Sequence, residues 1–143
     1  KLAGVYRYML KSEDEMVVSL RDELVFVNLY VDLLKERFPV GFSVETDVSE
    51  GMMARFVLPC SIQLLIENAV KHNVINASNP LIINIDIDNE CIRVTNNVIP
   101  KLTKVNSTGL GQKYIMKQYL DLCGKAIAIS HTDKEYSVVL PLI

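Results

Sequence analysis

The chain of 143 residues contains no long apolar run. No stretch approaches the roughly 18 consecutive apolar residues that a membrane-spanning helix needs. The first ten residues also lack the apolar region and the cleavage site of a signal peptide. We therefore expect a soluble segment, and its abrupt start within a helical pattern suggests a fragment of a longer protein.

The sequence also lacks an excess of positive charge. Its formal net charge is −2, its pI is about 5.7, and its lysines and arginines form no cluster. Because a phosphate backbone is held by concentrated positive charge, nucleic acid is not expected as a partner.

Cysteine is scarce, and the spacing of the three cysteines fits neither a disulfide framework nor a zinc site. Cys60, Cys91 and Cys123 are an odd number without a CxxC pair, and His72 and His131 do not cluster with them. This pattern is typical of reduced thiols in a cytosolic protein.

Half of the residues are apolar, which is enough for one core. The apolar spacing predicts helices over residues 1–11, 20–38, 59–73 and 111–122. It predicts strands over residues 41–47, 54–59, 81–87, 91–95, 126–130 and 136–140, with a tight turn at Asp88 and Asn89. This order predicts an α+β two-layer sandwich, in which helices cover one face of a mixed, mostly antiparallel sheet.

The helix over residues 20–38 has Ser19 and Asp22 at its start, at the spacing of a capping box. Apolar residues then recur at steps of four and three along the helix: Leu20, Leu24, Val27, Val31, Leu34 and Phe38. This seam is equally typical of a helix packed on a sheet and of a coiled-coil partner surface.

The helix that contains the sequence ENAVKHN carries four different polar side chains on one face. Its apolar residues fall in one arc, and its polar residues Glu67, Asn68, Lys71 and His72 fall in the opposite arc. A solvated surface would also be polar. However, Asn68 can offer Mg²⁺ an amide oxygen, Lys71 can neutralise phosphate oxygens, and Glu67 can order or deprotonate a nucleophile.

A second candidate segment is STGLGQKYI, where small residues and glycines precede a helix. The free backbone N–H groups at such a helix start attract phosphate. An ordinary junction between a loop and a helix has the same composition.

Pro59 followed by SIQLLIENAVKHN resembles the N-box of the ATPases that include gyrase, mismatch-repair proteins and histidine kinases. It is most similar to the bacterial sensor kinases related to autolysis and sugar-uptake regulators. The resemblance implies a Bergerat-type fold that binds ATP and Mg²⁺. It implies that Asn68 is the magnesium ligand and that Lys71 contacts phosphate. It also implies that His72 borders the nucleotide and that Glu67 is the acidic partner. Gln63 also matches, and either Gln63 or Glu67 could assist proton transfer.

STGLG resembles the second glycine box of the same family. This implies phosphate contacts from Thr108, Gly109, Leu110 and Gly111, with residues 98–107 as the lid. In the first glycine box, VTNNVIP, Asn96 replaces the usual adenine-binding aspartate and Val98 replaces a glycine. Because a neutral amide is a weaker acceptor than a carboxylate, we expect weaker ATP binding.

The N-terminal part resembles the linker helices of these kinases through three residue pairs: Arg7 and Tyr8, Glu23 and Leu24, Arg37 and Phe38. The resemblance implies a helical linker at 1–38, a catalytic domain at 39–143, and a phosphoacceptor histidine upstream of Lys1. It also implies a response regulator as partner, a homodimer formed through the helical region, and a cytoplasmic position within a parent protein of the bacterial inner membrane.

Three functions fit these features. The first is a histidine kinase catalytic domain that transfers the γ-phosphoryl group of ATP to the upstream histidine. The second is a degenerate kinase domain, which keeps the fold for dimerisation or signalling but has lost nucleotide affinity through Asn96 and Val98. The third is another ATPase or a serine kinase of the same superfamily, against which the linker resemblance argues.

Overall fold

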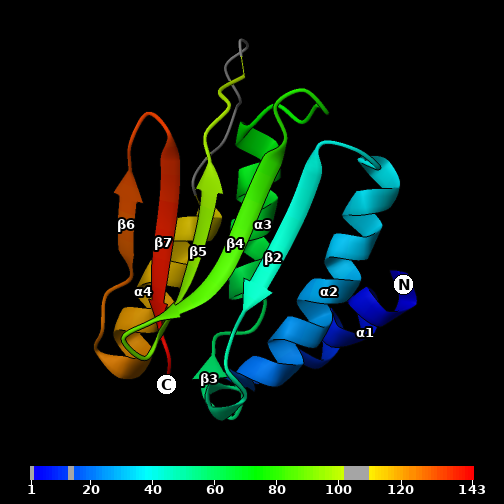
Figure 1. The fold of residues 1–143 in the computed structure, drawn as a ribbon. Helices are drawn as coiled ribbons and strands as arrows, with labels where there is room; N and C mark the ends of the chain where they lie inside the picture. The colour runs from blue at the N-terminus through cyan, green and yellow to red at the C-terminus, as the bar shows by residue number, and fades with distance from the viewer. Residues whose placement is uncertain (1, 13–14, 102–109) are drawn as a thin grey trace.

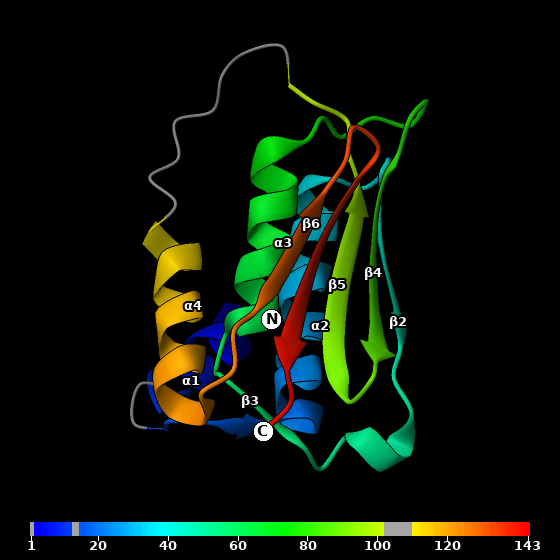
Figure 2. The ribbon, with the colours of Figure 1, turned by 90° about the vertical axis from the view of Figure 1, so that its left-hand side faces the viewer.

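The computed structural model describes residues 2–12, 15–101 and 110–143, which form two layers (Figure 1). One layer is a five-stranded sheet, and Figure 2 shows the helices gathered on one side of it. The predicted α+β sandwich is thus confirmed. None of the helices in the described part of the chain is long and apolar enough to cross a bilayer.

The sheet has the strand order β2-β4-β5-β7-β6. The strands are β2 (Phe42–Asp47), β4 (Leu81–Asp88), β5 (Cys91–Asn97), β6 (Ala128–His131) and β7 (Glu135–Pro141). Strand β2 runs parallel to β4, and the other neighbours are antiparallel, as predicted for a mixed sheet. A separate two-stranded sheet pairs β1 (Val18–Ser19) with β3 (Phe56–Val57).

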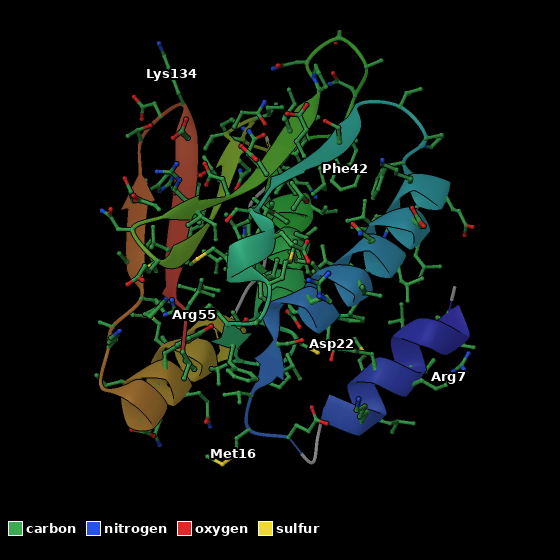
Figure 3. All side chains as sticks on the ribbon, turned by 60° about the horizontal axis from the view of Figure 1, so that its bottom comes forward. Arg7, Met16, Asp22, Phe42, Arg55 and Lys134 are labelled. Atoms are coloured by element: carbon green, nitrogen blue, oxygen red, sulfur yellow. The ribbon has the colours of Figure 1, made fainter. Side chains whose placement is uncertain are left out.

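The helical layer consists of α1 (Leu2–Ser12), α2 (Leu20–Arg37), α3 (Ser61–His72) and α4 (Leu110–Cys123), and a short 3₁₀ turn, η1, covers Glu50–Met52. Helix α3 lies between α4 and α2, and α1 packs on the outer side of α2 (Figure 1, Figure 3). The opposite face of the sheet carries polar pairs, among them Arg93, which donates to both carboxylate oxygens of Asp86 across β4 and β5.

The core lies between the two layers because alternate residues of each strand point to the helices. Ile83, Ile85, Ile92 and Leu140 of the sheet are fully or almost fully buried, and Ile66 of α3 meets them from the helical side. Alternation in the sequence was therefore a correct guide to the inward face of the sheet.

The apolar seam of α2 belongs to this same core. Leu20, Leu24, Val27 and Val31 are buried, and the remaining two seam residues pack against the cluster. Of the two interpretations, the core helix is correct, and the seam is not available to a partner chain. The division into 1–38 and 39–143 stays a prediction, although α2 shares its core with the sheet.

The structure corrects two local predictions. The hairpin between β4 and β5 turns at Asn89 and Glu90 instead of Asp88 and Asn89. Both turn residues have positive φ, 48° and 60°, as the favoured two-residue hairpin turn requires. Helix α3 begins at Ser61 instead of at Pro59, because Cys60 takes a left-handed conformation with φ 63° and interrupts the helix there.

Two close approaches join the ends of distant elements. Gly41, with φ 81°, precedes β2, and a Cβ there would lie 2.4 Å from the backbone of Asn76. Arg55, labelled in Figure 3, donates from Nη2 to the Leu142 carbonyl at 3.3 Å and so joins the β3 region to the end of the described chain. Cys60 and Cys91 form no disulfide bond in the described residues.

Candidate functional site

Helix α3 presents the predicted polar stripe at the surface. Ile62, Leu65, Ile66 and Ala69 are buried against the core, and Glu67, Lys71 and His72 are exposed. Asn68 is half-buried at the border between the two faces. The helical period had separated these residues correctly.

Gln63 and Glu67 form one edge of the stripe and lie toward α2. Gln63 is 5% exposed, and its Nε2 donates to Glu67 Oε2 at 2.9 Å. Burial, and with it the charge of Glu67, raises the pKa of the Tyr30 hydroxyl on α2, and the nearby Gln63 side chain opposes this rise. The structure thus brings the two proposed proton-transfer residues together, in contact with α2.

Asn68 and His72 lie one turn apart on the other edge of the stripe, and Lys71 lies between the two edges. The pKa of His72 is lowered by burial first, then by the positive charges of Lys71 and Lys101. The positive charges of Lys71 and Lys101 therefore lie together near the end of α3. Such a cluster suits an anionic ligand.

Asn73, a residue without a predicted role, connects the end of α3 to the segment after β5. The side chain is 5% exposed. Its Nδ2 donates to the Ala69 carbonyl at 2.9 Å, and its Oδ1 accepts from the Ile99 amide at 2.7 Å. The Val74 amide adds a bond to the Ile99 carbonyl at 2.9 Å. An asparagine directly after a helix with basic residues in its last turn was the available signal.

Asn96 points into the helical side of the sheet from β5 and is 6% exposed. Its Nδ2 donates to the Asn97 carbonyl at 2.8 Å, which leaves the amide oxygen as its acceptor group. The Asn97 side chain instead bonds to the backbone at the start of β4. Its Oδ1 accepts from the Ile82 amide at 2.8 Å, and its Nδ2 donates to the Pro80 carbonyl at 2.9 Å. The two neighbouring asparagines therefore have different roles.

Two of the four phosphate-loop candidates, Leu110 and Gly111, lie among the described residues. Thr108 and Gly109, and most of the predicted lid at residues 98–107, lie outside the described residues. Leu110 and Gly111 form the first turn of α4, so the predicted helix after the glycines is present. Val98, at the base of the predicted lid, donates its amide to the Lys134 carbonyl at 2.9 Å.

A cavity of about 430 Å³ lies beside the polar stripe, between the ends of α2 and α3. Its lining residues are Arg37, Phe38, Val70, Asn73, Val74, Ile75 and Lys101. Asn68, Lys71 and His72 are not among them, so the cavity adjoins the candidate site without containing it.

The donor set fits a magnesium ion that is held mainly by its substrate. The described residues contain no group of three or more His, Cys, Asp or Glu side chains that could enclose a metal. Magnesium in nucleotide enzymes usually has one or two protein ligands, and phosphates and water complete the octahedron. Asn68, half-buried beside a lysine, can supply one such oxygen.

A family model and two solved structures that resemble this chain are all of histidine kinases. The family model described as histidine kinase matches residues 1–42. The catalytic domain of histidine kinase ThkA, in a nucleotide-free form, has a TM-score of 0.56 at 17% identity and covers 87% of this chain and 95% of its own. The cytoplasmic segment of histidine kinase QseC has a TM-score of 0.57 at 14% identity, covering 89% and 78%. The chain therefore has the fold of a histidine kinase catalytic domain.

LytS sensor proteins are among the sequence relatives. The protein of Staphylococcus saprophyticus is 35% identical over 72 residues, which is 50% of this chain and 12% of that protein. The sensor histidine kinase/phosphatase LytS of Staphylococcus aureus is 28% identical over 112 residues, covering 78% and 18%. The chain thus spans less than a fifth of these relatives. It is related to sensor histidine kinases, and the resemblance inferred from ENAVKHN is confirmed.

Proposed function

We propose that this chain binds ATP with Mg²⁺ and transfers the γ-phosphoryl group to a histidine upstream of Lys1. The observation that carries the proposal is the polar face of α3, where Asn68, Lys71 and His72 stand together on a helix with a firmly buried opposite face. Magnesium, when bound, offsets the phosphate charge.

The residues divide the task by their chemistry. Asn68 offers its amide oxygen to the metal, and Lys71 places a cation beside the phosphates. Glu67 is the carboxylate on the same stripe, and Gln63 orients it because its Nε2 donates to Glu67 Oε2 at 2.9 Å. Asn96 accepts from the adenine amine, and Thr108, Gly109, Leu110 and Gly111 contact the phosphates.

The parent protein, by the same proposal, is a sensor kinase of the bacterial inner membrane with this chain in the cytoplasm and a response regulator as its partner. It forms a homodimer through the helical region. Since the α2 seam is buried, the contact surface is on α1, where Leu2 and Leu10 are exposed.

A degenerate kinase domain is the second candidate, and Asn96 favours it. A buried neutral amide that is already bonded to the Asn97 carbonyl holds adenine less strongly than an ionised carboxylate. The fold and the dimer contact would then be kept while nucleotide affinity is lost.

Calorimetry with a non-hydrolysable ATP analogue and Mg²⁺ decides between these two functions. We expect the native chain to bind in the micromolar to millimolar range, and the double variant Asn96→Asp, Val98→Gly to bind roughly tenfold more tightly, because a charged acceptor strengthens the adenine contact. Binding by the double variant alone would establish the degenerate domain. No binding by either protein would contradict the proposed function.

The ionisation of His72 provides an independent test of where the phosphates lie. Because burial and two lysines lower its pKa, the free imidazole is neutral at pH 7. Bound phosphates would offset the charges of Lys71 and Lys101 and raise this pKa, so binding takes up protons. Analogue affinity should therefore increase as the pH falls through the raised pKa of His72 in the complex towards its lower pKa in the free chain.

NMR titration of the imidazole signals with and without the Mg²⁺ analogue measures this effect. His131, at the end of β6, is the internal control in the same spectra. An unchanged His72 pKa at saturating analogue would place the phosphates elsewhere.

A further inference from the structure

Glu23 is a completely buried carboxylate on α2 that the proposed chemistry does not use. Its side chain is 0% exposed, among core residues of α2 that are otherwise apolar. Burial raises the pKa of this carboxyl, and its hydrogen bonds oppose that effect. An ionisable group in such a position is retained at a cost to stability unless its partners compensate for it.

The main partners of Glu23 are at the start of α3. Oε1 accepts from the Cys60 amide at 3.0 Å, and Oε2 accepts from the Ile62 amide at 3.1 Å. Helix α3 has no side-chain cap of its own, since Cys60 at the cap position makes no such bond. Glu23 thus supplies from α2 the acceptor and the negative charge that a helix start requires.

The third partner of Glu23 is on α1. The Tyr8 hydroxyl donates to Oε1 at 2.6 Å, and the Tyr8 ring stacks on Phe26 of α2, with centroids 4.1 Å apart. Burial, followed by the charge of Glu23, raises the pKa of Tyr8 above its usual value, so the hydroxyl stays a donor. One carboxylate therefore joins three helices.

The connection joins the linker helices to the candidate site. Residues 1–42, which the histidine kinase family model matches, include Tyr8 and Glu23 but not α3. Asn68 lies two turns along α3 from the amides that Glu23 holds. Because a helix of this length moves as a nearly rigid rod, a shift at its start displaces the polar stripe.

We propose that Glu23 is a positioning residue for α3. We also propose that the hydrogen bond from Tyr8 couples the contact between Glu23 and α3 to the position of α1. Movement of α1 then loosens the first turn of α3 and lowers nucleotide affinity. The part that concerns affinity rests on the proposed function, whereas the part that concerns α3 does not.

Tyr8→Phe tests the proposal, with Tyr6→Phe as the matched control on the same helix. Tyr8→Phe removes only the hydroxyl and keeps the ring on Phe26, and Tyr6 is 63% exposed. We expect amide hydrogen exchange at Cys60 and Ile62 to become about tenfold faster in Tyr8→Phe, and analogue affinity to fall three- to tenfold. Tyr6→Phe should change neither, and exchange in β4 and β5 should be the same in both variants.

Glu23→Gln extends the test into a double-mutant cycle. If Tyr8 acts through Glu23, then Tyr8→Phe has little further effect on exchange or affinity in the Glu23→Gln chain. Additive effects would overturn the proposal, as would equal exchange at Cys60 and Ile62 in the two tyrosine variants. If Glu23→Gln does not fold, the comparison of the tyrosine variants decides alone. A chain that shows the exchange effect but binds no nucleotide would refute the proposed function and leave the coupling intact.

Discussion

Asn68→Ala is expected to remove the dependence of nucleotide binding on Mg²⁺ and to weaken binding of the Mg²⁺ analogue by roughly 10- to 100-fold, about 1.4–2.8 kcal/mol. Asn68 is half-buried on the exposed side of α3 and is the only candidate metal ligand that we assign on that helix. Calorimetry with the analogue, first with Mg²⁺ and then with chelator, measures the change.

The substitution should leave the helix itself intact. Alanine has a higher helix propensity than asparagine, so the free energy of unfolding should change by less than about 0.5 kcal/mol. Asn28→Ala, at an exposed position of α2, makes the same chemical change away from the site. A Mg²⁺-dependent gain in affinity that persists in Asn68→Ala would show that another group holds the metal.

The polar stripe could be read from the sequence because it depends on local geometry alone. A period of 3.6 residues separates Ile62 and Ile66 from Glu67 and Lys71 whatever the helix packs against. The same holds for the strands, where alternation placed Ile83 and Ile85 inward. Family resemblance then added roles that periodicity cannot supply, such as a metal ligand at Asn68.

Long-range hydrogen bonds could not be predicted in this way. Glu23 meets Ile62 across 39 positions, and Asn73 meets Ile99 across 26. Both are polar residues that a solvated surface would also explain. The α2 seam was ambiguous for a related reason, because the pattern of Leu20 and Leu24 shows which face is apolar but not what covers it. The β4–β5 turn was predicted one residue too early because glutamate at positive φ is uncommon.

Asn73→Ala is expected to lower the free energy of unfolding by about 1–3 kcal/mol, because the substitution leaves the Ile99 amide without its acceptor in a part-buried position. For a chain of this size the melting temperature should fall by roughly 3–10 °C. Since Asn73 fixes the segment that leads to Lys101, analogue affinity should also fall several-fold. Thermal unfolding followed by circular dichroism and calorimetry measure the two effects.

Asn73→Asp separates the two bonds of this side chain. The aspartate keeps an acceptor for the Ile99 amide, but it loses the donor to the Ala69 carbonyl and adds a negative charge at the end of α3, where the helix dipole disfavours it. Its stability should therefore stay below that of the native chain, and a melting temperature above that of Asn73→Ala would show that the acceptor outweighs the lost donor and the added charge. Asn79→Ala, in the exposed loop after α3, is the control for the loss of an asparagine side chain. If Asn73→Ala melts like that control, then the pairing of Val74 with Ile99 through the backbone is sufficient to hold this segment, and the affinity of the site for nucleotide does not depend on Asn73.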